Sequence, residues 1–414
     1  MATMTAIDPM VPEVRHRLFL RPGRDASVRA HHPWVFSGAV DRVESLPGAE
    51  DGDCCDVHEA GGEWLARGTL HRSSQIVCRI LTWEAGEEIN EGFFRERIAD
   101  AIRLRSEILD LTRTDAYRVV NAEGDRLPGL IVDRYGDHIV VQVLTTGMAR
   151  LQPIWCAALD SALAPLSIID RTERAVHDPG MTGRLEALRG TVPTDPVWIC
   201  ENGLKFSVNL ITGQKTGFYL DQRENRRLCG SLAAGREVLN GFAYTGAFGA
   251  YAGRGGAARV VQLESSAWAT DEARTNWEAN GLPADRVEYV RDDVFRYLRR
   301  ESRSFDMIIL DPPPYAKDRG SVDRAARAYK DVNLWALRRL RSGGLLLTFS
   351  CSQHVGIDLF QKILFGAARD ARANCQWLQR LGPGPDHPVH LDQPQGEYLK
   401  GFLLRLCSRD DSGE

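Results

Sequence analysis

The apolar positions of residues 1–85 come in short runs that are separated by Gly, Pro and Asp. Such runs stand at residues 28–40, 63–70 and 75–83. Short apolar runs bounded by turn residues are typical of β-strands. The pattern therefore predicts a small β-barrel or sandwich over the first 85 residues.

Residues 86–195 combine helical and strand periodicities. Residues 91–109 carry apolar side chains near helical spacing, which predicts an amphipathic helix. The turn signals E-G-D and Y-G-D divide residues 117–145 into three strands of a meander. A second helix at 149–163 and a strand at 167–171 complete a predicted α+β unit. The apolar stripe of the first helix consists of Phe94, Ile98, Ile102 and Leu109.

Residues 179–196 are rich in Gly, Thr and Pro and predict a linker or domain edge. In residues 196–414 a hairpin-like segment at 204–223 precedes alternating strand and helix patterns. The predicted strands lie at residues 236–240, 259–264, 287–290, 305–311, 344–350, 375–381 and 398–406. Helical segments separate the first six strands and none separates the last two. This alternation predicts a Rossmann-like parallel sheet with right-handed crossovers and an antiparallel last strand.

The composition fits two or three globular domains. The chain has 414 residues, of which 43% are hydrophobic and 26% charged. The net charge is −4, so local patches would have to hold a nucleic-acid partner. The first residues show no secretory signal pattern, and no apolar run approaches the roughly 20 residues of a membrane span. A cytoplasmic protein without membrane contact is expected, and a homodimer is left open.

The nine cysteines are odd in number, scattered and without a C-x-x-C pair. This distribution argues against a disulfide framework and against a zinc site, so no metal is predicted. Reduced thiols that fill the core are the general expectation. The cysteines are Cys54, Cys55, Cys78, Cys156, Cys200, Cys229, Cys351, Cys375 and Cys407.

The loop "NGFAYTGAFG" at residues 240–249 follows the first strand of the predicted parallel sheet and opens a helix. Glycines at such a place let the backbone approach a ligand at a helix N-terminus. Glu264 ends the second strand, where an acid can accept ribose hydroxyls. A tight turn and a solvated acid are the alternatives. After the third strand, Asp292 or Asp293 could meet an adenine amino group or cap a helix.

"DPPPY" at residues 311–315 ends the fourth strand. Three prolines fix φ, remove backbone donors and prevent a helix, which leaves a rigid rim. Asp311 could bind the edge of a flat base there, with Pro312 and Pro313 beside it and Tyr315 stacked on it. A plain rigid turn is the alternative.

Cys351 ends the fifth strand, between Ser350 and Ser352. A thiol needs help to ionise at neutral pH, and the helix that begins near Ile357 or the side chain of His354 could supply it. Taken alone, Cys351 is equally well interpreted as a nucleophile or as a core residue.

The sequence resembles the RlmI family of large-subunit (23S) ribosomal RNA cytosine-5 methyltransferases. The resemblance runs nearly end to end, through "HPWVFSGAV", "GQKTGFYLDQR", "YTGAFG", "VRDDVF", "DPP", "YKDVN", "TFSCS", "DHPV" and "GEYLKGF". It implies a PUA-type RNA-binding domain (1–85), a middle α+β domain (86–195) and a class I methyltransferase domain (196–414). S-adenosylmethionine is the implied methyl donor, and ribosomal RNA is the implied partner.

The resemblance also implies roles for single residues. Cys351 is the expected nucleophile and Asp311 the expected carboxylate on the base. The expected cofactor-binding residues are Tyr219, Asp221, Asn240, Tyr244, Gly246, Glu264, Asp292, Asp293 and Asp311. Tyr219 and Asp221 could instead brace the sheet edge.

Methylation of cytosine at carbon-5 explains the need for a thiol, because addition of a thiolate to carbon-6 turns carbon-5 into a nucleophile for the methyl group. An acid that shares a proton with ring nitrogen-3 stabilises this addition. A base must later remove the carbon-5 proton, and the candidates are His354, Asp386, His387 and water.

Two other functions stay open. "DPPPY" is also similar to the rim of amino-group methyltransferases, which need no thiol. A non-catalytic RNA-binding or assembly protein with a methyltransferase fold is the second. Basic clusters such as residues 15–32, with five arginines and one acid, fit phosphate contacts or solvated faces.

Overall fold

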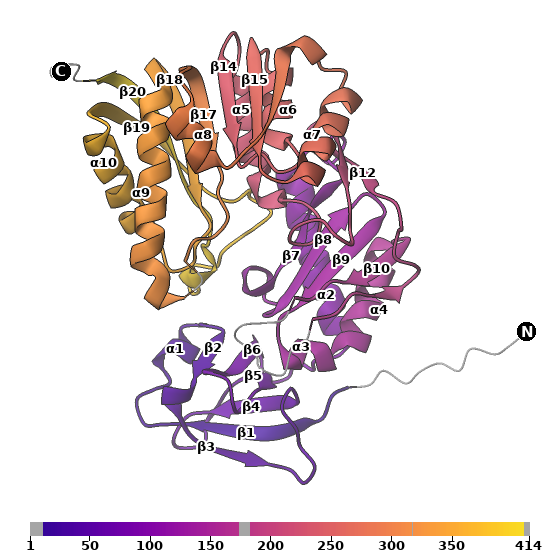
Figure 1. Cartoon of the computed structure of the whole chain (residues 1–414). Coiled ribbons are helices and arrows are strands. Elements are labelled where there is room, and N and C mark those ends of the chain that lie inside the picture. Colours follow the sequence, from indigo (N-terminus) through magenta and orange to yellow (C-terminus); the bar gives the residue numbers. More distant parts are fainter. Residues whose placement is uncertain (1–10, 174–182, 317, 410–414) are drawn as a thin grey trace, which may run out of the picture. The chain divides into compact units, whose positions relative to one another are not determined.

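The computed structural model describes residues 11–173, 183–316 and 318–409. The chain divides into two compact units (Figure 1). The first unit comprises Met1–Val197, Val208–Phe218 and Pro385–Gly396, and the second comprises the remaining segments, which run from Trp198 to the C-terminus. Among the described residues, no helix is long and apolar enough to cross a membrane.

The first sheet of the first unit has six strands in the order β2-β6-β5-β4-β1-β3. The edge strands β2 and β3 are joined through a single 3-10 turn, Ser37–Ala39, so the chain links the two edges as in a barrel. The strands are β1 (Val14–Leu20), β2 (Trp34–Phe36), β3 (Val40–Ser45), β4 (Cys54–His58), β5 (Trp64–Leu70) and β6 (Ile76–Thr82).

The predicted strands at 63–70 and 75–83 are confirmed as β5 and β6, whereas the run at 28–40 is confirmed only in part, by β2 and the first residue of β3. That run contains the end of helix α1 (Ala26–Arg29), a turn and the short β2. The reason is local, because His31 adopts a left-handed φ of 63° and the backbone N–H of Trp34 donates to His32 Nδ1.

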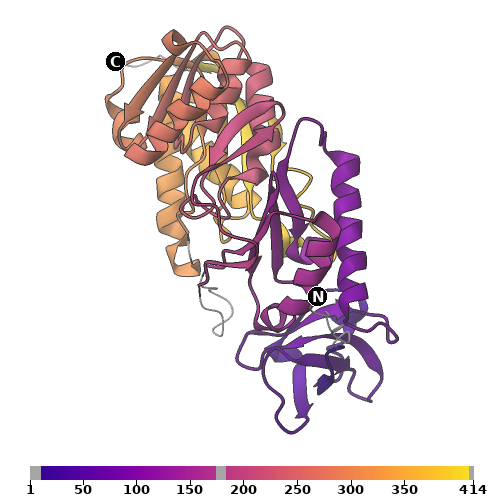
Figure 2. The same cartoon turned by 90° about the vertical axis from the view of Figure 1, so that its right-hand side faces the viewer.

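The second sheet of this unit has the order β11-β10-β9-β8-β7. Helices α2 (Glu91–Ile108) and α4 (Gln152–Leu163) bury Phe94, Ile98 and Trp155 in the core they share with the sheet. Figure 2 shows the length of α2 beside these strands. The strands are β7 (Ala116–Asn121), β8 (Leu130–Tyr135), β9 (His138–Val143), β10 (Ser167–Asp170) and β11 (Glu186–Arg189).

The predicted helix at 91–109, the meander and the strand at 167–171 are therefore confirmed. The segment predicted to be a linker or domain edge, 179–196, also contains the short strand β11, which pairs antiparallel with β10 at the edge of the sheet. Residues 179–182 of that segment lie outside the described residues. The pairing partner lies far along the chain, so the local Gly, Thr and Pro content could not show it.

The second unit contains a seven-stranded sheet in the order β16-β15-β14-β17-β18-β20-β19. β20 is antiparallel to both of its neighbours, and the pairs from β16 to β18 are parallel, as predicted. The strands are β14 (Glu237–Gly241), β15 (Arg259–Glu264), β16 (Val287–Arg291), β17 (Phe305–Leu310), β18 (Leu340–Ser350), β19 (Ala373–Leu381) and β20 (Lys400–Arg409).

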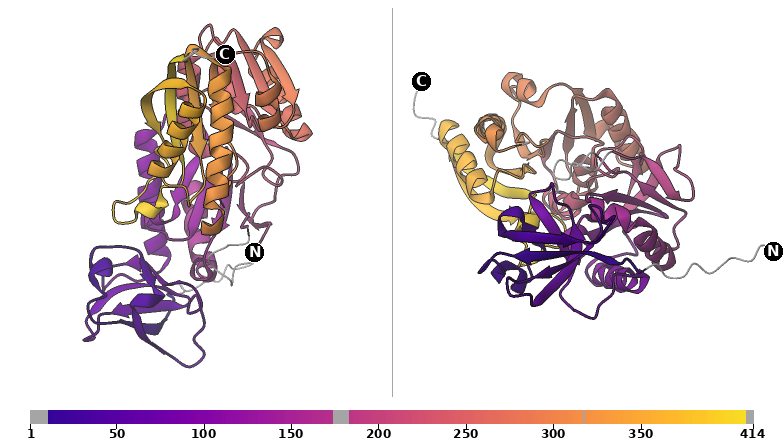
Figure 3. Two further views of the ribbon diagram at one scale, coloured as in Figure 1. Left: turned by 60° about the vertical axis from the view of Figure 1, so that its left-hand side comes forward. Right: turned by 90° about the horizontal axis from the view of Figure 1, so that it is seen from below.

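Helices cover both faces of this sheet because successive strand residues point to opposite sides. Val238 belongs to a core with helices α5 to α7, and Leu239 belongs to a core with α8 to α10. Figure 3 (left) shows α9 and α10 lying along the same part of the sheet. The helices are α5 (Arg223–Leu232), α6 (Ala247–Arg254), α7 (Ala267–Ala279), α8 (Val294–Arg300), α9 (Val322–Arg339) and α10 (Ile357–Asp370).

A hairpin does precede the sheet, but not where the sequence predicts it. Strands β12 (Val197–Glu201) and β13 (Leu204–Val208) pair across Asn202-Gly203. Both turn residues have positive φ, 51° and 78°, which Asn-Gly adopts readily in a two-residue hairpin turn. The predicted hairpin at 204–223 is therefore wrong, since its second half consists of turns with one isolated bridge, Gln214 to Gly217.

Candidate functional site

The parallel strands of the second unit bring the predicted site residues to one edge. Gly241 at the end of β14 is in register with Leu263 of β15 and Leu310 of β17. Leu310 is in register with Thr348 of β18. Carboxyl ends of parallel strands meet at the same edge of a sheet. The residues that follow these strands, among them Asp311 and Cys351, therefore emerge together.

The loop after β14 is held in an unusual conformation. Phe242, Tyr244 and Gly246 have φ of 58°, 48° and 78°. Gly246 begins helix α6, and a Cβ added there would stand 2.7 Å from Cβ of Ala273. Since L side chains disfavour this backbone and no space is available, glycine is required at this position.

Asn240 braces this loop from beneath. Its side chain is 1% exposed, and Nδ2 donates to Gln262 Oε1 at 2.8 Å. Gln262 Nε2 in turn donates to the carbonyl oxygen of Gly246 at 3.1 Å. The structure thus places the Asn240 side chain in a buried support of the loop, while Gly246 and Tyr244 form the loop itself.

Glu264 lies where β15 ends and is half-buried. Its Oε2 accepts the backbone N–H of Tyr244 at 2.9 Å, and Oε1 accepts the backbone N–H groups of Ser265 and Ser266 at 2.8 and 2.9 Å. These bonds fix the carboxylate beside the glycine loop. Oε1 also accepts the hydroxyl of Ser265, whereas Oε2 accepts the Tyr244 N–H and has a further lone pair that can accept a neighbouring hydroxyl.

The two acids after β16 have different surroundings. Asp293 is exposed, and its side chain caps α8 by accepting the backbone N–H of Arg296 at 2.9 Å. The helix-cap interpretation is confirmed for this residue. Asp292 accepts Arg296 Nε at 2.6 Å, and this hydrogen bond lowers its pKa.

Cys351 and the proline rim lie against each other. Cys351 is half-buried, and its Sγ lies 3.8 Å from the carbonyl oxygen of Pro312. Asp311, also half-buried, precedes that proline. Burial, together with the charges of Asp311 and Cys351, raises the pKa of Tyr219, so all three side chains share one neighbourhood.

Tyr219 and Asp221 connect this neighbourhood to the loop and to the far end of the chain. The ring of Tyr219 meets that of Tyr244 edge-on, with centroids 5.5 Å apart. Asp221 is 3% exposed, and its Oδ2 accepts the hydroxyl of Tyr398 at 2.5 Å. Tyr219 thus faces the predicted cofactor loop, whereas Asp221 is held in a buried hydrogen bond.

Tyr315 packs inward rather than along the rim. Its ring lies 4.7 Å from that of Tyr329 and 6.1 Å from that of Phe295. Burial raises its pKa. The neighbouring Pro313 is exposed and Pro312 is buried. Of the three predicted base contacts, Pro313 is exposed, Tyr315 half-buried and Pro312 buried.

A hydrogen-bond cluster behind Cys351 escaped the sequence analysis. Ser352 Oγ accepts the backbone N–H of Ala316 at 3.1 Å and lies 3.0 Å from the hydroxyl of Tyr329. Lys400 Nζ donates to the carbonyl oxygen of Ser352 at 2.8 Å. The sequence signal for this cluster is that its members lie in motifs of the family resemblance: Ser352 in TFSCS, Tyr329 in YKDVN and Lys400 in GEYLKGF.

The candidates for the carbon-5 base lie in both units. His354 is half-buried in the second unit. Asp386 and His387 are buried in the first unit, where Asp386 Oδ2 accepts the backbone N–H of Arg118 at 3.0 Å. Asp386 therefore has a structural role in the middle sheet.

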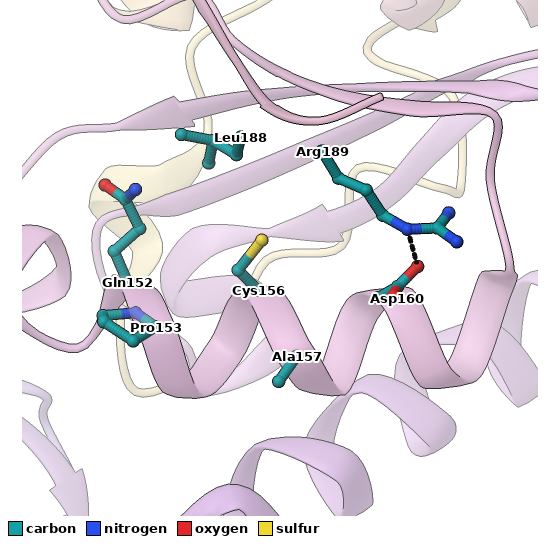
Figure 4. Close-up of a pocket in the computed structure, with 7 residues that line it drawn as sticks. All are labelled: Gln152, Pro153, Cys156, Ala157, Asp160, Leu188 and Arg189. Atoms are coloured by element: carbon teal, nitrogen blue, oxygen red, sulfur yellow. Dashed lines mark ion pairs between the residues drawn. The ribbon is translucent and has the colours of Figure 1, made fainter. Parts of the chain in front are cut away.

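A cavity of about 310 Å³ lies elsewhere, between α4 and β11 of the first unit (Figure 4). Arg189 Nε and Asp160 Oδ1 form an ion pair of 2.6 Å within it. None of the predicted site residues lines this cavity. Within the described ranges, no group of three or more His, Cys, Asp or Glu could hold a metal ion. The cavity is lined by Gln152, Pro153, Cys156, Ala157, Asp160, Leu188 and Arg189.

Two segments of the chain match known protein families. Residues 180–405 match the family model of S-adenosylmethionine-dependent methyltransferases, and residues 18–83 match that of a PUA-like domain. Among solved structures, a candidate SAM-dependent methyltransferase from Streptococcus mutans has the same fold. Its TM-score is 0.79 at 22% identity, over 94% of this chain and 100% of that chain.

Curated relatives match over nearly the full length. The ribosomal RNA large subunit methyltransferase I of Photobacterium profundum is 42% identical over 389 residues, which cover 93% of this chain and 98% of the relative. A relative of the same name from Serratia proteamaculans is 42% identical over 394 residues, which cover 94% and 99%. The chain belongs to this ribosomal RNA large subunit methyltransferase I family of S-adenosylmethionine-dependent methyltransferases.

Proposed function

We propose that this protein methylates carbon-5 of a cytosine in large-subunit ribosomal RNA through a covalent bond between Cys351 and carbon-6. The names of the relatives support the RNA substrate. The observation that carries the chemistry is the half-buried thiol of Cys351 beside the Asp311 rim, on the edge that holds the glycine loop. The PUA-like domain is the proposed contact for the RNA.

The residues present fit S-adenosylmethionine. Glu264 offers a fixed carboxylate oxygen for a ribose hydroxyl, and Gly246 stands directly before helix α6, so the glycine loop ends at a helix N-terminus. Tyr244 and Trp268 add aromatic rings, 6.0 Å apart, next to that carboxylate. When bound, the cofactor supplies a methyl group on a positively charged sulfur.

The chain's own residues then carry the covalent steps. The Cys351 thiolate donates an electron pair to carbon-6, and the displaced ring electrons reach nitrogen-3, which takes a proton from Asp311. Carbon-5 would take the methyl group, with the methyl–sulfur bond breaking and its electron pair staying on the sulfur, while the nitrogen-3 proton returns to the Asp311 carboxylate. A base removes the hydrogen from carbon-5, the carbon-5–carbon-6 double bond re-forms, and the Cys351 thiolate leaves.

The test is the Cys351→Ala variant on ribosomal RNA. Formation of 5-methylcytidine should fall at least ~10³-fold, because loss of a nucleophile removes the covalent route. Binding of S-adenosylmethionine, measured by calorimetry, should stay within twofold. The matched control is Cys407→Ala, which removes a half-buried thiol from β20 away from the strand end and should leave the rate unchanged.

A second readout traps the adduct. RNA with fluorine on carbon-5 of cytosine cannot lose a proton there, so the wild-type protein should remain covalently bound and the Cys351→Ala variant should not. Methylation that survives Cys351→Ala on an amino group would favour the alternative chemistry of the D-P-P rim. A wild-type protein that binds S-adenosylmethionine but methylates no RNA would favour the assembly role.

A further inference from the structure

Lys400 is a buried cation next to the proposed nucleophile. Its side chain is 3% exposed, at the first residue of β20. The antiparallel register places Lys400 opposite Ser350, the residue before Cys351. Its Nζ donates to the carbonyl oxygens of Ser352 and Tyr398, at 2.8 and 2.7 Å. The ammonium therefore holds the backbone just beyond the sulfur.

Carbonyl groups alone do not compensate a buried charge. Moving an ammonium out of water is costly unless an anion lies close by. Across the described residues, no carboxylate stands within ion-pair distance of Lys400. Burial lowers the pKa of Lys400, and the nearby charges of Cys351 and Glu397 oppose that effect. An ionised Cys351 would thus supply part of the compensation.

Among the described groups whose pKa responds to Cys351, those other than Lys400 carry no positive charge. The groups whose pKa responds to the charge of Cys351 are Tyr219 before α5, Tyr315 on the rim, Tyr329 of α9 and Lys400 of β20. Asp311 acts on the same tyrosine, Tyr219. Phenols and carboxylates become negative when they ionise, whereas Lys400 is positive. Lys400 is thus the member of this set that favours a thiolate.

We propose that Lys400 is a positioning residue of the methyl-transfer site, whose ammonium holds Cys351 in the thiolate form and fixes the strand end that carries it. The inference rests on the proposed function, in which Cys351 is the nucleophile.

The test measures the ionisation of Cys351 directly. The full-length protein is alkylated with iodoacetamide between pH 5 and 10, and the peptide that contains Cys351 is quantified by mass spectrometry. In the wild type, the apparent pKa of Cys351 should lie below the ordinary value of ~8.5. A wild-type value at or above ~8.5 would overturn the proposal without any variant.

The variants separate charge from hydrogen bonding. Lys400→Gln keeps a donor and removes the charge, and should raise the apparent pKa of Cys351 by about one unit, so that alkylation at pH 7 slows about tenfold. Lys400→Arg keeps the charge and should recover most of that loss. Lys362→Met, which removes an exposed lysine from α10, is the control and should change nothing.

Catalysis provides the second readout. In Lys400→Gln, the acid limb of the pH profile of kcat/KM should move upward by the same amount as the alkylation profile. An alkylation profile that is identical in Lys400→Gln and wild type would contradict the role of Lys400. Full methylation by Cys351→Ala would instead contradict the proposed function, and it leaves the alkylation result standing.

Discussion

The middle sheet and the C-terminal sheet place their charged residues differently. In the middle sheet, charges are buried in pairs: Arg118 Nε lies 2.8 Å from Asp133 Oδ1, with side chains 9% and 1% exposed. In the C-terminal sheet, Glu264 and Asp311 stand half-buried at strand ends. The first arrangement satisfies charges within the protein, and the second leaves carboxylates partly exposed to solvent at one edge.

Topology explains this difference. Strands β7, β8 and β9 are antiparallel, so their ends alternate between the two edges and polar residues cannot gather at one of them. Strands β14 to β18 run parallel, so every carboxyl end reaches the same edge. The comparison predicts that polar substitutions in the middle sheet change stability, whereas those at the C-terminal edge change ligand binding.

The largest expected effect on stability is that of Asp133→Ala. The carboxylate accepts from Arg118 and, at 2.6 Å, from the hydroxyl of Thr216. Its removal leaves the Arg118 guanidinium buried without its anion, which should lower the free energy of unfolding by ~3–5 kcal/mol. Urea denaturation of the full chain measures the effect. Asp137→Ala, in the exposed turn between β8 and β9, is the control and should stay within ~0.5 kcal/mol.

An unchanged unfolding midpoint in Asp133→Ala would contradict the statement that buried charge pairs stabilise the middle sheet. The same would follow if the variant were as stable as wild type but had lost affinity for S-adenosylmethionine. In that case the buried pair would serve the cofactor site rather than the fold.

The sequence predicts the C-terminal sheet well because its five inner strands, β15, β14, β17, β18 and β20, are largely buried on both faces. Such strands appear as continuous apolar runs, and the helices between them separate the runs clearly. All seven predicted strands are confirmed, from β14 to β20. The strand-end residues could also be predicted, since the edge at which they meet follows from parallel topology alone.

Elements that depend on distant pairing could not be predicted. β11 has four residues and exists because β10 offers an edge, and nothing in its own composition shows this. Lys400 looks like a solvated residue in the run "YLKGFLLRL", and only its pairing with β18 buries it. The exposure of single thiols could not be predicted either: burial raises the pKa of Cys229 to about 12, whereas Cys351 is half-buried.

The next effect in size concerns Glu264→Gln at the edge of the C-terminal sheet. Glutamine keeps an oxygen for the loop N–H groups but loses the charge that strengthens bonds to hydroxyls. A hydrogen bond to a charged group contributes about 1.5–3 kcal/mol, so affinity for S-adenosylmethionine should fall about 10- to 100-fold. Calorimetry measures this loss, and the free energy of unfolding should fall by ~1–3 kcal/mol at most, since one backbone N–H of the loop loses its acceptor.

Glu278→Gln, an exposed change on α7, is the matched control for that experiment. It removes one negative charge from the same unit without touching the loop. If both variants bound the cofactor equally well, Glu264 would only support the turn. The statement that residues at the C-terminal edge serve ligand binding would then be contradicted.

The smallest effect separates the two interpretations of Asp293. Its side chain caps α8, and an aspartate cap contributes ~1 kcal/mol that asparagine retains. Asp293→Ala should therefore lose ~1 kcal/mol of unfolding free energy and Asp293→Asn almost none, while both bind S-adenosylmethionine as wild type does. Reduced cofactor affinity in Asp293→Asn, at unchanged stability, would show that the carboxylate also contacts the ligand. The ligand-binding edge of the sheet would then extend from the end of β14 to the end of β16, because Asp293 would both cap α8 and bind the cofactor.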